Sequence, residues 1–146
     1  MKNIPLRLLL VEDSSDDVDL FMQALKRSEA GLEVEVVHDG EEALHYLKRG
    51  NSFANPELPQ LILLDLNLPK KHGCQVLREI KNDDRLRMVP VIVFTTSNAP
   101  ADVTCAYELG AACYLIKPDS FNGLLEMIRN IGVFWSAVKL PPLDGN

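Results

Sequence analysis

Leu61-Ile62-Leu63-Leu64-Asp65 is the stretch that decides the fold, because it places an acid directly after four aliphatic residues. A second stretch, Leu8-Leu9-Leu10-Val11, repeats the pattern and ends in the acidic pair Glu12-Asp13. Short, wholly apolar runs are typical of strands buried on both faces in the middle of a parallel sheet. Because ligands bind at the carboxyl ends of such strands, we expect the three carboxylates to lie together there. Three clustered carboxylates predict a cation site.

Two further apolar runs end in polar residues that suit the same edge of the sheet. Residues 91–94 are followed by Thr95, and residues 112–116 are followed by Lys117. Oxygen ligands from carboxylates and a backbone carbonyl favour Mg²⁺, or Mn²⁺, which often shares its shell with a phosphate. A phosphoryl group moving onto Asp65 would have the metal on one oxygen, the Thr95 hydroxyl on a second and the Lys117 ammonium on a third.

The order of strand and helix patterns predicts an α/β fold with five strands and five helices. Strands are expected at about 6–12 and 32–37 and in the three later apolar runs, with helical periodicity between them and a last helix from Ser120 to about Ile131. Such alternation implies βαβ units, a parallel sheet and right-handed crossovers. The polar loop from Gly50 to Pro59 is the segment expected to be least ordered.

The composition predicts one domain over residues 1–146, with a short helical extension from about residue 132 and no effector domain. The net charge of −6, without a basic cluster, argues against nucleic-acid binding. The sequence has no apolar stretch of membrane-spanning length and no signal-peptide pattern, so we expect a cytoplasmic protein that binds no membrane. Three cysteines without close pairing are expected to stay reduced.

The acidic pair, the acceptor-like acid, the threonine and the Lys117-Pro118 pair together resemble the receiver domains of two-component response regulators. The spacing agrees with that family, since Thr95 and Lys117 lie 30 and 52 residues after Asp65. The resemblance to these chemotaxis-regulator-like domains implies a flavodoxin-like, three-layered fold with strand order 2-1-3-4-5. It also implies that Asp65 is the phosphoacceptor, and that the bond before Pro118 is usually cis.

The same resemblance implies a set of metal ligands. Asp13 and Asp65 would contact the ion directly, the main-chain carbonyl of Asn67 would add a third oxygen, and Glu12 would act mainly through a bound water. Many relatives have aspartate where this chain has Glu12. Asn67 and Ser97 resemble the positions that tune hydrolysis of the acyl phosphate.

A narrower resemblance is to the single-domain regulators of cyanobacterial phytochromes. The shared residues are the segment from Leu63 to Lys71, the triplet Thr95-Thr96-Ser97, and a Phe134-Trp135 tail that ends in Leu140-Pro141. This resemblance implies a sensor histidine kinase of the bacterial phytochrome type as the partner, and a homodimer.

Several of these residues also have simpler interpretations. Lys117 alone would be an ordinary surface lysine, and Tyr114 is either a core aromatic or the family's aromatic switch residue. Along the last helix, Met127, Phe134 and Val138 fall on a face beside the sheet-facing stripe. Either the tail folds back over this face or a second copy of the chain covers it, and we favour the homodimer.

Two other functions are consistent with the same fold class. A flavin carrier needs a phosphate-cradling loop after the first strand, but the acids in residues 12–17 would repel phosphate. An aspartyl-phosphate phosphatase of the dehalogenase type would need an acid at position 67, where this chain has Asn67. A receiver-like module that is never phosphorylated is the third alternative. We expect a signalling protein and not an enzyme, catalysing only its own phosphotransfer and slow dephosphorylation.

Overall fold

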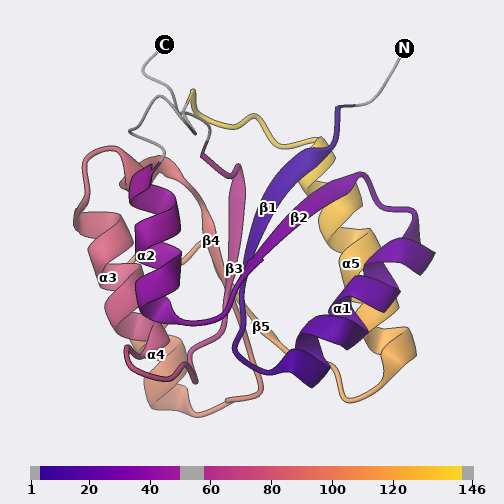
Figure 1. Cartoon of the computed structure of the whole chain (residues 1–146), viewed down its shortest axis with the longest axis horizontal. Helices are drawn as coiled ribbons and strands as arrows, with labels where there is room; N and C mark the ends of the chain where they lie inside the picture. Colours follow the sequence, from indigo (N-terminus) through magenta and orange to yellow (C-terminus); the bar gives the residue numbers. More distant parts are fainter. Residues whose placement is uncertain (1–3, 50–57, 143–146) are drawn as a thin grey trace.

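A computed structural model describes residues 4–49 and 58–142 of the chain, and in them one parallel sheet lies between two layers of helices (Figure 1). The strand order is β2-β1-β3-β4-β5, which confirms the predicted topology. The strands are β1 (Leu6–Val11), β2 (Leu32–Val37), β3 (Leu61–Leu64), β4 (Val91–Thr95) and β5 (Cys113–Ile116). The helices are α1 (Ser15–Ser28), α2 (Gly40–Arg49), α3 (Gly73–Asn82), α4 (Pro100–Glu108) and α5 (Phe121–Ser136), with a short 3-10 turn at Leu86–Met88.

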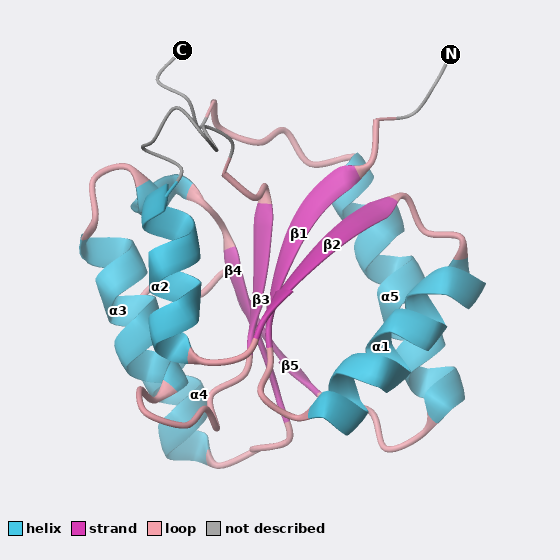
Figure 2. Cartoon of the chain, in the orientation of Figure 1, coloured by secondary structure: helices cyan, strands magenta, loops and turns pink. Residues whose placement is uncertain are grey.

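The two faces of the sheet are covered by different helices (Figure 2). Helices α1 and α5 lie on one face, and α2, α3 and α4 lie on the other. Alternate residues of each central strand enter opposite clusters: Leu8 and Leu10 pack toward α1 and α5, whereas Leu9 and Val11 pack toward α2 and α3. This two-residue alternation explains why the strands are apolar throughout, since both of their faces are buried.

The helix boundaries follow local capping chemistry. The Ser14 hydroxyl caps α1 by accepting a hydrogen bond from the backbone N–H of Asp17 at 3.2 Å, and Ser120 caps α5 in the same way. Helix α5 continues without a break to Ser136, so the helical part of the tail is continuous with the last helix. Strand β1 ends one residue earlier than predicted, although the Glu12 N–H still donates to the Val37 carbonyl.

Parallel pairing brings the carboxyl ends of all the strands to one edge, the lower edge in Figure 1. Val11 of β1 is paired with Leu64 of β3, so the residues that follow them, Glu12 and Asp65, are neighbours. The Asp65 N–H donates to the Val11 carbonyl at 3.1 Å, which extends this register by one residue. Most of the loop predicted to be least ordered lies outside the described residues. Within those residues, every helix is too short or too polar to cross a bilayer.

Candidate functional site

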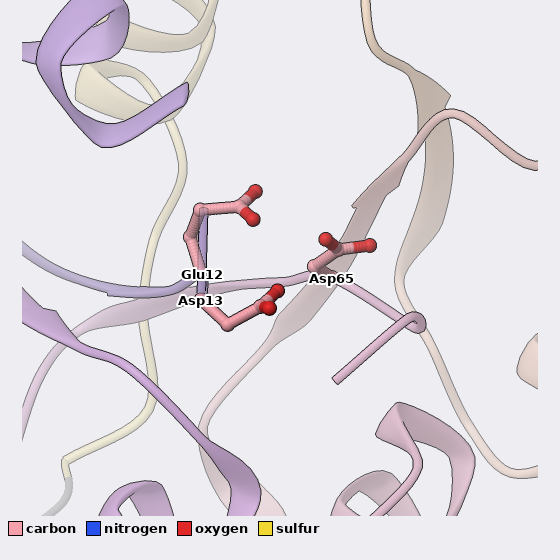
Figure 3. Close-up of side chains that lie close together, drawn as sticks. All are labelled: Glu12, Asp13 and Asp65. Carbon is pink, nitrogen blue, oxygen red and sulfur yellow. The ribbon is translucent and has the colours of Figure 1, made fainter. Parts of the chain in front are cut away.

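Three carboxylates meet where β1 and β3 end. Glu12, Asp13 and Asp65 each place a carboxylate oxygen within 4.8 Å of the others (Figure 3). Glu12 and Asp65 are almost fully buried, with exposed fractions of 2% and 5%, whereas Asp13 is exposed. The cluster is therefore open to solvent on the Asp13 side and closed on the Glu12 side.

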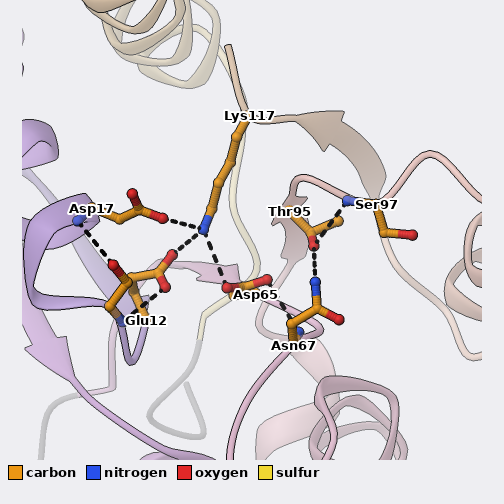
Figure 4. A network of polar contacts seen from close by, with 8 residues as sticks. Glu12, Asp17, Asp65, Asn67, Thr95, Ser97 and Lys117 are labelled. Atoms are coloured by element: carbon orange, nitrogen blue, oxygen red, sulfur yellow. Dashed lines mark hydrogen bonds and ion pairs between the residues drawn. The ribbon is translucent and has the colours of Figure 1, made fainter. Parts of the chain in front are cut away.

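Lys117, the first residue after β5, points inward to these acids (Figure 4). Its ammonium donates to Glu12 Oε1 at 2.5 Å, to Asp17 Oδ2 at 2.9 Å and to Asp65 Oδ2 at 3.2 Å. The Lys117 backbone N–H donates to the Thr95 carbonyl at 2.8 Å, which fixes the point where the side chain leaves the sheet. The lysine is thus part of the acidic site, and the ordinary surface interpretation is wrong.

The acid–lysine cluster changes the protonation of its members. Burial raises the pKa of Glu12 to about 7; the hydrogen bond from Lys117 opposes this effect, and the charge of Asp65 adds to it. For Lys117, burial alone would lower the pKa, but the hydrogen bonds to Glu12 and Asp17 outweigh it and raise the pKa above its usual range. The ammonium therefore keeps its charge at neutral pH.

Thr95 lies on the other side of Asp65 from the ammonium (Figure 4). Its side chain is fully buried, and its Oγ1 accepts from the Asn67 amide at 3.5 Å and from the Ser97 N–H at 3.4 Å. The Asn67 N–H in turn donates to Asp65 Oδ1 at 3.2 Å. Asp65 therefore accepts hydrogen bonds from the Lys117 ammonium and the Asn67 N–H, and the Thr95 hydroxyl lies on the other side of it from the ammonium.

Tyr114 of β5 is connected to this hydroxyl through the loop after β4. Its phenol donates to the Ser97 carbonyl at 2.8 Å, and its partly buried ring packs against the core on the α2 and α3 side. Because the Ser97 N–H also donates to Thr95 Oγ1, Ser97 links the tyrosine to the threonine by hydrogen bonds to both side chains. Both interpretations of Tyr114, core residue and switch residue, remain compatible with this position.

The donor set suits a hard divalent cation. All three acids offer carboxylate oxygens, the ligands that Mg²⁺ and Mn²⁺ prefer. Glu12 accepts hydrogen bonds from Lys117 and the Ser14 N–H, and Asp65 accepts them from Lys117 and the Asn67 N–H. A cation would therefore share Asp65 with these donors, whereas Asp13 is exposed on the solvent side of the cluster. The expected third ligand, the Asn67 carbonyl, belongs to the loop that follows Asp65.

Two features of the site differ from the sequence interpretation. Asp17 contacts the ammonium but was not predicted to do so, because an acid in the first turn of a helix is common for electrostatic reasons alone. Its position in the turn after the acidic pair was the only available signal. Among the described residues no peptide bond is cis, so the Lys117-Pro118 bond is trans, the isomer that is lower in energy for most X-Pro bonds.

The apolar residues predicted on the outer side of the last helix share one groove. Met127, Phe134 and Val138 line it together with side chains of the edge strand β5, including Cys113 and Leu115. Phe134 is 63% exposed, while Met127 and Val138 are half-buried. Of the described tail residues, Val138 lines this groove and Leu140 lines a separate depression, so the folded-back tail and the second copy both stay predictions.

Comparisons with known proteins agree with this site. The sequence profile described as "Response regulator receiver domain" matches residues 8–129. The curated "Response regulator Rcp1" of Synechocystis sp. is 44% identical over 140 residues, which cover 95% of each chain. A Mn²⁺-bound crystal structure of Rcp1 superposes with a TM-score of 0.82, covering 94% of this chain and 100% of that one.

A second solved relative is the phosphorylated cyanobacterial phytochrome response regulator RcpA. It is 41% identical to this chain and superposes with a TM-score of 0.85, covering 94% of this chain and 99% of its own. With the sheet order, the acidic cluster and the inward lysine in place, the conclusion is direct: this chain belongs to the response regulator receiver domain family and is similar to cyanobacterial phytochrome response regulators.

Proposed function

We propose that Asp65 accepts a phosphoryl group from the phosphohistidine of a sensor histidine kinase, and that the phosphorylated chain signals through changed protein binding. One observation carries this proposal: a buried Asp65 carboxylate lies between the Lys117 ammonium and the Thr95 hydroxyl, beside two further carboxylates. A flavin carrier would need no such acceptor, and four acids at this edge, with Asp17 included, would repel a flavin phosphate.

The chemistry follows from the positions of these groups. A carboxylate oxygen of Asp65 forms the new bond to phosphorus while the phosphorus–nitrogen bond of the donor breaks and the imidazole leaves. Lys117 and Thr95 are placed to stabilise charge on the phosphoryl oxygens because they flank the acceptor. A divalent cation held by Asp13, Asp65 and the Asn67 carbonyl would supply further positive charge to those oxygens.

The path by which the phosphorylated state is signalled runs through Thr95 and Tyr114. A Thr95 hydroxyl that turns toward the phosphoryl group gives up its contact with the Ser97 N–H. Ser97 also holds the Tyr114 phenol, so the loop and the tyrosine would move together. This movement would change the surface formed by α4, β5 and α5, where a target binds.

The kinase partner is proposed to be a phytochrome-type photoreceptor. The support is similarity alone: RcpA is described as a cyanobacterial phytochrome response regulator, and another solved relative, 39% identical, as a bacteriophytochrome response regulator. The net charge of −6 and the lack of a basic cluster favour protein targets over nucleic acid.

Phosphotransfer from purified kinases tests this function. A labelled phytochrome-type kinase should transfer its phosphoryl group to the wild-type chain in a base-labile form. Asp65→Asn should remove the labelling and leave the fold intact, whereas Asp16→Asn, which changes an exposed acid outside the cluster, should label normally. Labelling of Asp65→Asn at the wild-type rate would exclude Asp65 as the acceptor.

We also propose that the α5 groove is the interface of a homodimer. Met127, Phe134 and Val138 line this apolar groove, and the exposed Phe134 ring is suited to fill the same groove of a second copy. A two-fold arrangement would bury both copies of the groove at once. Apolar burial would then provide most of the stabilisation.

Analytical ultracentrifugation of two matched variants tests the interface. Phe134→Asp should give monomers, because a charge in the centre of the interface would be desolvated without a partner. Val133→Asp makes the same change at the adjacent residue, which is 72% exposed and lines a different depression, and should leave the dimer unchanged. A wild type that stays monomeric at high concentration, with and without phosphorylation, would contradict the dimer.

A further inference from the structure

The Lys117 ammonium has three N–H groups, and each has a carboxylate acceptor: Glu12, Asp17 and Asp65. Two of these acids belong to the acidic cluster, but Asp17 does not. We propose that Asp17 is a positioning residue that competes with the acceptor Asp65 for the Lys117 ammonium before phosphorylation and thereby slows phosphoryl transfer. This inference rests on the proposed function, because it concerns the transfer of a phosphoryl group to Asp65.

The geometry shows a competition for the ammonium. Asp17 and Asp65 approach Lys117 Nζ from different directions (Figure 4), at 2.9 Å and 3.2 Å. The contact with the acceptor is the longest of the three. Glu12 is buried and accepts a second hydrogen bond from the Ser14 N–H. Its carboxylate is therefore a fixed acceptor for the ammonium. How strongly the ammonium interacts with Asp65 therefore depends on Asp17.

The local sequence fixes Asp17 in this place. Ser14 caps α1 through the Asp17 N–H, and the same serine donates its own N–H to Glu12 Oε2. One residue thus couples the start of α1 to the buried acid. The Asp17 side chain is 42% exposed, whereas that of Lys117 is 11% exposed, so Asp17 forms the solvent-facing rim of the cluster. Of the three acids, Asp17 is the one most able to release the lysine.

Phosphorylation changes which acceptor the ammonium prefers. In the reaction with acetyl phosphate, a carboxylate oxygen of Asp65 bonds to phosphorus, the bond from phosphorus to the acetyl oxygen breaks, and acetate leaves with the electron pair. The phosphoryl oxygens carry more negative charge than one carboxylate, so they attract the ammonium more strongly as the bond forms. The Asp17 contact weakens at that stage, and its loss adds to the barrier.

The test uses acetyl phosphate, which avoids any effect of Asp17 on kinase docking. Asp17→Ala and Asp17→Asn should each label Asp65 about twofold to fivefold faster than wild type, the effect expected from a partly exposed ion pair. Asp17→Glu, which keeps the charge, should restore a rate close to that of wild type. The acceleration should shrink at high salt, because salt weakens the competing ion pair in the wild type.

Asp16→Ala is the matched control, since it removes an exposed acid from the same helical turn that is not one of the three acceptors of the Lys117 ammonium. Equal acceleration in Asp16→Ala would assign the effect to general repulsion of the anionic donor and overturn the inference. Unchanged or slower labelling in both Asp17→Ala and Asp17→Asn, with circular dichroism showing intact folds, would also overturn it. Failure of the proposed function is recognised separately, because the wild type itself would then not be labelled on Asp65.

Discussion

Gly73, the first residue of α3, is the position where a single methyl group would disturb the acceptor most directly. A Cβ at this glycine would lie 2.5 Å from the Asp65 carbonyl oxygen and 2.6 Å from the Leu66 Cα. Both atoms are backbone, so neither can move aside by a change of rotamer. The Gly73 N–H also donates to the Leu66 carbonyl at 3.0 Å, which holds the start of α3 against the acceptor loop.

Gly73→Ala therefore has to displace either α3 or the segment that carries Asp65. Overpacking of this kind costs about 3 kcal/mol of unfolding free energy. For a chain of 146 residues this corresponds to a fall in Tm of roughly 10 °C. Because the acceptor carboxylate moves with its backbone, labelling of Asp65 by acetyl phosphate should slow by about tenfold.

Urea unfolding and acetyl phosphate labelling measure the two effects separately. Gly31→Ala is the control, because a Cβ there has no neighbour within 4 Å and should change stability by about 1 kcal/mol or less. If Gly73→Ala matched Gly31→Ala in stability and labelled Asp65 at the wild-type rate, the close approach of α3 to the acceptor would be refuted as a constraint.

Three other predictions concern the charged cluster. Binding of Mn²⁺, followed by isothermal calorimetry, should be lost in Asp13→Ala combined with Asp65→Ala, and phosphotransfer should stop in excess chelator; retained binding would place the metal elsewhere. The folded-state pKa of Glu12 is raised from 4.5 to about 7, so the folded chain binds its proton more tightly and stability should fall as pH rises through this window in metal-free buffer. Glu12→Gln should flatten that slope in urea titrations, and an unchanged slope would contradict the assignment. Thr95→Ala should slow the response of Tyr114 to phosphorylation more than it slows labelling, which fluorine NMR of fluorotyrosine would detect.

The sequence by itself determined the fold class and the residues at the sheet edge. Runs such as Leu61–Leu64 are apolar on both faces, and this pattern is typical of a strand in the middle of a parallel sheet, where both faces are buried. Parallel strands bring their carboxyl ends to one edge, and the pairing of β1 with β3, which the family resemblance implied, makes Glu12 and Asp65 neighbours. Hydrophobic periodicity predicts the type and order of the strands and helices. It does not predict their end residues, because these depend on single hydrogen bonds.

Tertiary structure decided how the charges are shared. Asp17 pairs with Lys117 across 100 positions of sequence because α1 and the end of β5 pack at the same corner, and no local pattern encodes that approach. The direction of the Tyr114 phenol and the groove beside Phe134 likewise depend on how α4 and α5 rest on the edge strand. Local sequence determines which charged groups lie at the edge of the sheet. The distances between these groups are set only when separate helices and strands pack together. Because electrostatic energy depends on distance, the tertiary structure determines how strongly the charges interact.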